Sequence, residues 1–143
     1  AEEAMNFYVS IFKNAKAGKI TRYPEGGQAP AGTAMTCTFH LDGQDFIALN
    51  AGPMFTFTPA ISFSVDCKSQ EEVDHFWEKL SEGGTKERCG WLKDKFGLSW
   101  QIVPSVLGEL MGDKDPAKAQ SVMQAMMQMD KIDIAVLKKA YES

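Results

Sequence analysis

The polar residues of this chain that best suit ligand chemistry lie on strand-like stretches. Asn50 stands three residues before Pro53, and Gln101 stands three residues before Pro104. An amide side chain donates and accepts hydrogen bonds without carrying charge, so both residues suit the binding of a polar small molecule. Each also has a structural alternative, in which it bonds to nearby backbone at a strand end.

His40, Ser62 and Ser64 add an imidazole and two hydroxyls to these candidate ligand-binding residues. An imidazole can act as a general base. No carboxylate is placed by sequence spacing to orient His40, so we expect it to donate or accept hydrogen bonds in a pocket.

Alternation along the strands defines a polar side and an apolar side. The polar side is predicted to line a pocket and carries Thr36, Thr38, His40, Ala48, Asn50, Ser62, Ser64, Ser99 and Gln101. The apolar side is predicted to face helices, through Ile47, Leu49, Ile61, Phe63 and Val65. The alternative is that the polar side is only the solvated face of an antiparallel sheet.

The elements that must position these residues repeat along the chain. The first set is a helix at 2–13, then strands at 19–23, 36–41 and 45–50, with a tight turn at Asp42-Gly43. The second set is a strand at 60–66, a helix behind the capping box Ser69–Glu72, and strands at 85–89, 91–93 and 98–103. We therefore predict an α+β domain over residues 1–143, with one module at 1–53 and a second at 60–104.

Two further features follow from this repeat. The second module begins with a strand, so we expect the first module to have a matching strand before Ala1. After Pro104 the pattern becomes helical, and residues 105–143 are predicted to form a C-terminal extension of helices, in which Asp133 caps the last one.

The stretch Cys89–Pro104 is the most distinctive in the sequence and predicts the hairpin that closes the second module. Its corner, Lys93-Asp94-Lys95, is typical of a charged turn in solvent. Trp100 lies on the opposite strand face from Gln101, which favours a place in the core. The functional part of this stretch is therefore predicted to be Gln101, facing Asn50 across a pocket.

Composition narrows the class of protein. The chain has 143 residues and a net charge of −4, so it offers no broad attraction to nucleic acid. No apolar run approaches the roughly 20 residues that cross a bilayer, and no signal peptide is evident. Cys37, Cys67 and Cys89 are odd in number and widely spaced, which suits reduced thiols in a cytoplasmic protein.

The sequence resembles the vicinal oxygen chelate superfamily, the glyoxalase/bleomycin-resistance/dioxygenase fold, and within it the PhnB-like group, often labelled 3-demethylubiquinone 3-methyltransferase. Three stretches carry the resemblance: Ala1–Tyr8, Gly43–Asn50 and Cys89–Pro104, with a further likeness at Ala125–Ile134. The resemblance implies paired βαβββ modules, which form a curved, incomplete mixed β-sheet barrel with helices outside. It also implies a homodimer, to which the methionine-bearing tail would contribute.

Enzymes of this superfamily usually hold a divalent metal with side chains from the first and last strands of each module. Mapped residue by residue, those positions in this chain include Asn50, Ala60 and Gln101. Alanine cannot bind a metal and neutral amides are poor ligands for a hard cation. We therefore expect no conventional metal centre and no cofactor.

Three functions remain open at this point. The leading hypothesis is a PhnB-like protein that binds a small molecule in a polar pocket. One alternative is a metal-dependent lyase, isomerase or dioxygenase that uses His40, Gln101 and a residue of the preceding strand. The other is a resistance-type protein that sequesters a drug. A methyltransferase of the doubly wound type would need a glycine-rich strand–turn–helix, and neither Gly26-Gly27 nor Gly83-Gly84 lies in that context.

Overall fold

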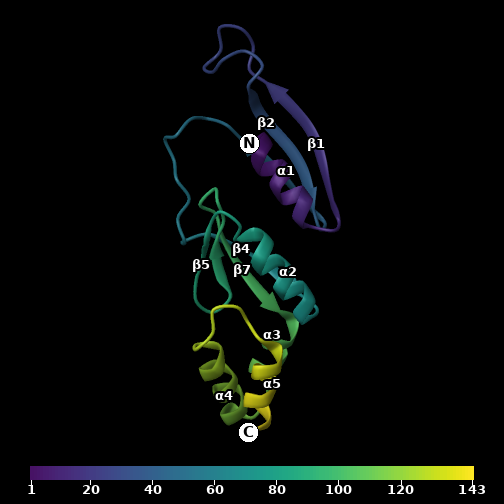
Figure 1. Ribbon diagram of the computed structural model, residues 1–143, viewed down its shortest axis with the longest axis vertical. Coiled ribbons are helices and arrows are strands. Elements are labelled where there is room, and N and C mark those ends of the chain that lie inside the picture. Colours follow the sequence, from purple (N-terminus) through teal and green to yellow (C-terminus); the bar gives the residue numbers. More distant parts are fainter. The chain divides into compact units, whose positions relative to one another are not determined.

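The structure, a computed structural model, describes residues 1–143. It divides into two compact units, unit 1 at Ala1–Thr56 and unit 2 at Phe57–Ser143 (Figure 1). Each unit holds one sheet, and neither sheet closes into a barrel. The α+β class predicted from the sequence is confirmed. That the whole chain forms a single domain stays a prediction.

Unit 1 is a helix on a three-stranded antiparallel sheet. Its elements are α1 (Glu2–Ile11), β1 (Ala15–Arg22), β2 (Ala34–Leu41) and β3 (Gln44–Leu49), and the sheet order is β1-β2-β3. The buried face of α1 carries Met5, Tyr8 and Ile11. The Tyr8 ring stacks on Phe39 of β2 with 6.2 Å between ring centroids. This contact anchors α1 on the sheet.

Unit 2 contains the complete βαβββ module that the sequence predicted. Its elements are β4 (Ser62–Cys67), α2 (Gln70–Leu80), β5 (Thr85–Lys86), β6 (Trp91–Lys93) and β7 (Ser99–Pro104), in the sheet order β4-β7-β6-β5. β4 runs parallel to β7 and the other pairs are antiparallel, so the sheet is mixed. As the capping box predicts, Ser69 Oγ accepts a hydrogen bond from the Glu72 N–H at 3.2 Å. The Glu72 carboxylate accepts from the Lys68 N–H, one residue before the cap, at 2.8 Å.

The C-terminal extension is helical, as predicted: α3 (Ser105–Met111), α4 (Pro116–Met126) and α5 (Ile134–Glu142). These helices enclose their own small core of Leu107, Val122, Ile132 and Leu137. The side chain of Asp133 caps α5 by accepting from the Val136 N–H at 3.1 Å.

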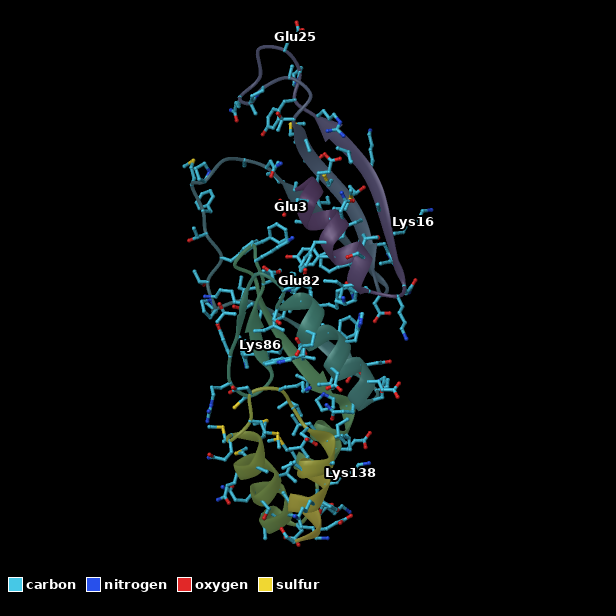
Figure 2. The ribbon with its side chains drawn as sticks, viewed as in Figure 1. Glu3, Lys16, Glu25, Glu82, Lys86 and Lys138 are labelled. Carbon is cyan, nitrogen blue, oxygen red and sulfur yellow. The ribbon has the colours of Figure 1, made fainter.

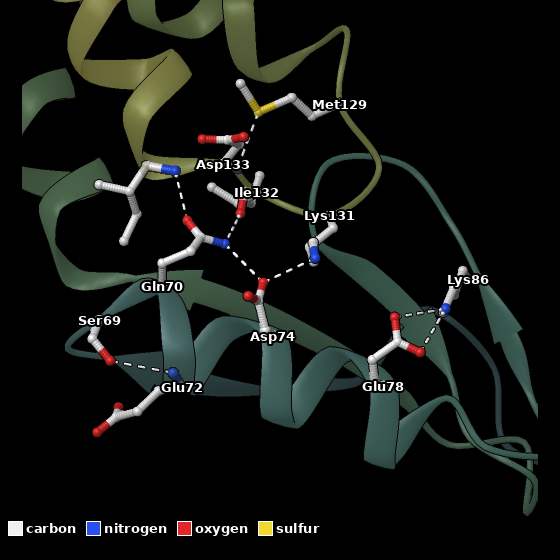
Figure 3. Close-up of polar contacts among 11 residues, drawn as sticks. Ser69, Gln70, Glu72, Asp74, Glu78, Lys86, Met129, Lys131, Ile132 and Asp133 are labelled. Atoms are coloured by element: carbon white, nitrogen blue, oxygen red, sulfur yellow. Dashed lines mark hydrogen bonds and ion pairs between the residues drawn. The ribbon is translucent and has the colours of Figure 1, made fainter.

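The segment that follows α4, residues 127–133, together with the first residue of α5, Ile134, attaches the extension to the module, and we call residues 127–134 the latch. The Gln70 side chain donates to Ile132 O at 3.0 Å and accepts from the Ile134 N–H at 2.8 Å (Figure 3). Asp74 accepts from Gln70 at 3.0 Å and pairs with Lys131 at 2.9 Å. These hydrogen bonds lower the pKa of the Asp74 carboxyl, that from Gln70 most.

On its other side the latch bonds to the chain that enters β6. The Cys89 and Gly90 N–H groups donate to Met129 O and Asp130 O at 2.8 and 2.7 Å. Gly90 has φ of 80°, and a Cβ there would lie 2.8 Å from Ile102 O. The residue at this point must therefore be glycine.

Several sequence expectations need correction. Ile47 and Leu49 were expected to face a helix, but they are 73% and 60% exposed. The cause is register, because the two-residue turn sets Thr38 opposite Ile47 and Thr36 opposite Leu49, on the face that α1 does not cover.

The predicted strand ends also differ from the observed ones. β4 begins at Ser62 rather than Ala60, and Ile61 is 68% exposed instead of packing on a helix. β5 is only two residues long. The Glu87 N–H still donates to Trp91 O at 2.9 Å, and the chain then turns and meets the latch at Cys89. Lys86 of β5 (Figure 2) pairs with Glu78 of α2 at 2.9 Å (Figure 3). No helix has the length and apolar character that spanning a bilayer requires.

Candidate functional site

The face of the unit 2 sheet that points away from α2 carries a compact array of polar side chains, which we call the polar grid. Strand register fixes its membership, because residues directly opposite one another share a face. Ser99 of β7 lies opposite Ser62 of β4 and Lys93 of β6. One step along, Gln101 lies opposite Ser64 and Trp91. The polar grid is therefore two rows of three: Ser62, Ser99 and Lys93, then Ser64, Gln101 and Trp91.

The opposite face of the same strands is apolar, and it is buried except at Phe63, which is 37% exposed. Val65, Trp100 and Ile102 are at most 8% exposed, and the Phe63 ring meets Trp100 edge-on with centroids 5.3 Å apart. Trp100 is therefore a core residue, as predicted. The alternation read from the sequence for β4 and β7 is confirmed, with the serines and Gln101 on the other side.

Gln101 is the centre of the grid. Its side-chain nitrogen donates to Ser62 Oγ at 3.0 Å, across the parallel pair. Its side-chain oxygen has no partner, so it is an acceptor open to a ligand or water. Ser99 is fully buried, and its hydroxyl has no hydrogen-bond partner. A buried, unpaired hydroxyl is unfavourable by about 1–3 kcal/mol.

The negative charge of Asp66, near the C-terminal end of β4, is compensated by its neighbours. Asp66 accepts hydrogen bonds from Lys68 and Ser105, and these bonds, that from Lys68 foremost, lower the pKa of its carboxyl. The Asp66 carboxylate is therefore already paired.

Asn50 has a structural role in unit 1. Its side-chain nitrogen donates to Ala34 O at 2.9 Å, and its side-chain oxygen accepts from the Ala1 nitrogen at 2.7 Å. The Tyr23 hydroxyl donates to its backbone oxygen. Asn50 also lines a hollow of about 470 Å³ with Tyr23, Gln28, Ala29, Thr33, Leu49 and Ala51–Pro53. Asn50 therefore bonds to nearby backbone at a strand end, which is the structural alternative given above. That it faces Gln101 across a pocket stays a prediction.

His40 has a carboxylate partner that the sequence reading missed. Its Nδ1 lies 3.0 Å from Asp45 Oδ1, and its Nε2 accepts from the Gly43 N–H at 3.1 Å. The expectation that no carboxylate orients His40 was therefore wrong, because the two-residue turn places Asp45 directly opposite it. Both ring nitrogens of His40 are therefore engaged, and the side chain joins β2 to the turn at Gly43 and to Asp45 of β3.

Asp94 also departs from expectation, since it was predicted to be a solvated turn residue and is 3% exposed. Its Oδ1 accepts from the Phe96 and Leu98 N–H groups at 2.9 and 3.0 Å. Its Oδ2 accepts from the Trp100 indole N–H at 2.9 Å. The carboxylate thus organises the turn that positions Ser99 and Gln101, and the signal for it was an Asp three residues before a Gly.

No group of three or more His, Cys, Asp or Glu side chains is placed to hold a metal ion. The grid itself offers hydroxyls, an amide, an ammonium and an indole, which suit hydrogen bonding and stacking rather than coordination of a hard cation. The grid can therefore donate and accept hydrogen bonds, and it offers one flat apolar surface at Trp91.

Comparison with known proteins gives a consistent family. The family described as 3-demethylubiquinone-9 3-methyltransferase matches residues 1–103. A structure from Bacillus cereus, described provisionally as a 3-demethylubiquinone-9 3-methyltransferase, PhnB protein, is 40% identical, with a TM-score of 0.67 over 73% of this chain and 90% of that one. No curated protein matches the chain.

A second structure shares the fold. Protein PA1353 from Pseudomonas aeruginosa is 19% identical, with a TM-score of 0.60 over 73% of this chain and 88% of that one. The family match ends at Val103, at the end of β7, so it covers both units as far as the module that carries the polar grid. The chain belongs to the 3-demethylubiquinone-9 3-methyltransferase family, the PhnB-like group of glyoxalase-fold proteins.

Proposed function

We propose that this chain is a cytoplasmic protein that binds a polar small molecule at the polar grid, without a conventional metal centre. The observation that carries the proposal is Gln101, whose amide nitrogen is fixed by Ser62 while its oxygen has no partner. Because Ser62 already fixes the Gln101 amide, a hydrogen bond from a ligand to the Gln101 oxygen costs little side-chain entropy. The three cysteines are all unpaired, which supports a reducing compartment.

The proposal assigns binding rather than methyl transfer, despite the family description. A methyltransferase of the doubly wound type holds its cofactor at the start of a helix that follows a glycine-rich turn. In unit 2 the pair Gly83-Gly84 follows α2 and leads into β5, and the sheet is not doubly wound. The fold by itself assigns no reaction.

A thermal-shift screen of metabolites and divalent metals, followed by titration of the hits, tests this function. We expect a metabolite to raise the melting temperature of the wild-type chain, and Gln101→Leu to lose that shift. Gln124→Leu, the same change at an exposed position of α4, is the matched control and should keep it. One tightly bound divalent ion per chain, lost in Gln101→Ala, would refute the proposal and support the metal-dependent lyase, isomerase or dioxygenase. A drug-like hit without turnover would support sequestration.

We also propose that the protein is a homodimer. Support comes from large apolar side chains in solvent, including Met123 and Met127 of the tail, which are 41% and 52% exposed. Light scattering at micromolar concentration should give twice the chain mass of 15.8 kDa. A mass of one chain would refute the dimer and leave the binding proposal intact.

A further inference from the structure

We infer that the ligand of the polar grid carries a carboxylate next to a flat apolar part, with Lys93 holding the carboxylate and Trp91 packing against the flat part. This inference rests on the proposed function and names the class of ligand. The third column of the grid holds Lys93, which the sequence pattern assigned to a solvated turn, and Trp91.

Lys93 has no anionic partner, unlike three other lysines of unit 2. Lys86 pairs with Glu78 at 2.9 Å, Lys131 pairs with Asp74 at 2.9 Å, and Lys68 pairs with Asp66. Lys93 is half-buried on the grid face and forms no ion pair. A partly desolvated ammonium without a counter-ion attracts an anion more strongly than an exposed one does.

The acidic groups nearest in the chain do not compensate this charge. Asp94 follows Lys93 directly, but its carboxylate accepts three N–H groups within the turn and lies on the buried side. Asp66 is on the grid face of β4, but Lys68 and Ser105 occupy it. Opposite Lys93 on β5 stands Thr85, which is neutral. The charge of Lys93 is therefore available to a ligand.

Ser99 supplies the second, independent observation. It lies directly opposite Lys93, and its buried hydroxyl has no partner. Side chains directly opposite in an antiparallel pair have Cβ atoms about 5 Å apart, so the Lys93 stem lies beside Ser99. A carboxylate that draws the Lys93 ammonium toward itself uncovers this hydroxyl and accepts its hydrogen bond, which removes an unsatisfied polar group.

Trp91 defines the other end of the ligand. It is half-buried, lies two residues before Lys93 on β6, and stands opposite Gln101. Two residues along a strand span about 6.6 Å, within the length of an arylalkyl carboxylate. The indole offers a flat apolar surface, while the Gln101 oxygen and Ser64 hydroxyl lie in the same row for a polar substituent.

The test uses the full chain, labelled with ¹⁵N and titrated with 3-phenylpropionate or with its neutral amide, 3-phenylpropionamide. The carboxylate should saturably shift the backbone signals of Trp91, Lys93 and Ser99, and should bind about tenfold or more tightly than the amide. Lys93→Met should remove this preference, and Lys93→Arg should restore it. Lys114→Met, at an exposed position outside the grid, should leave both affinities unchanged.

Ser99→Ala separates the hydroxyl from the charge. It removes a buried unpaired group, so the free variant should fold at least as stably as the wild type, while its affinity for phenylpropionate falls severalfold. Dispersed spectra of each variant confirm folding.

Three results would overturn the inference. Equal binding of both probes at the grid would refute the carboxylate and leave the proposed function standing. Carboxylate shifts centred on Lys68 and Lys138 instead of Lys93 would place the anion elsewhere. Absence of saturable binding by either probe would also reject this ligand class, and the metabolite screen with Gln101→Leu then decides the proposed function separately.

Discussion

Asp94→Ala is the substitution for which the structure gives the clearest magnitude. The Asp94 side chain is 3% exposed and accepts the N–H groups of Phe96, Leu98 and Trp100 at 2.9–3.0 Å. Hydrogen bonds to a charged group contribute about 1.5–3 kcal/mol each. Truncation leaves the buried N–H groups of Leu98 and Trp100 unpaired, while water can reach the half-buried Phe96 N–H. Removing the buried charge offsets part of the loss, so we expect about 3–5 kcal/mol of destabilisation.

Asp94→Asn separates the two oxygens. The amide keeps an acceptor for the Phe96 and Leu98 N–H groups but turns a donor toward the indole N–H of Trp100. We expect a loss of about 1–3 kcal/mol, the cost of one unsatisfied buried donor. Combining it with Trp100→Phe removes the conflict, so the double variant should lose less than the sum of the single ones.

Urea unfolding followed by circular dichroism measures these free energies. Glu82→Ala, at an exposed acidic residue of the same unit (Figure 2), is the control and should change stability by less than about 0.5 kcal/mol. A loss below about 1 kcal/mol for Asp94→Ala would refute the assignment of this carboxylate as the organiser of the turn. Additive losses in the double variant would refute the Trp100 bond specifically.

Three further outcomes follow from other parts of unit 2. The pKa of Asp74 is lowered by its bonds to Gln70 and Lys131, so its contribution to latch attachment is complete above the ordinary pKa of 3.8 and is lost as the pH falls through the folded pKa. Hydrogen exchange at the latch should therefore rise on acidification, and an unchanged exchange rate would contradict this. Burial raises the pKa of the Cys67 thiol to about 12, so iodoacetamide at pH 8 should label half-buried Cys89 well before Cys67. Equal labelling rates in the folded protein would refute the protection of Cys67 by burial. Gly84→Ala should destabilise strongly, because a Cβ would lie 2.1 Å from the carbonyl oxygen of Lys93, and an unchanged urea midpoint would refute this close approach.

The sequence alone predicted most of the elements because their signals are local. The capping box at Ser69 and the alternation in β4 and β7 depend only on neighbouring residues, and both are observed. The His40–Asp45 pair was also within reach, since a two-residue turn at Asp42-Gly43 fixes which residues lie opposite. It was missed because the two strands were read separately, and the same omission put Ile47 on the wrong face.

Other features depend on contacts that no local pattern contains. The bonds from Gln70 to Ile132 and Ile134 join residues more than 60 positions apart. The place of Lys93 in the candidate site likewise follows only from the pairing of β6 with β7. The sequence shows that most residues of the grid are polar, but only the strand register shows which of them lie side by side.

The order β4-β7-β6-β5 has a consequence for how this protein is made. The interior strand β7 is the last strand of the unit 2 sheet to leave the ribosome. Its parallel partner β4 precedes it by 37 positions, since Ser62 lies opposite Ser99. In unit 1 each strand pairs with the next one in the chain, so that sheet can form by successive hairpins during synthesis. In unit 2, β4 and α2 cannot pack against β7 until the chain has been synthesised as far as Pro104. We therefore expect the second module to be more prone to aggregation during synthesis than unit 1.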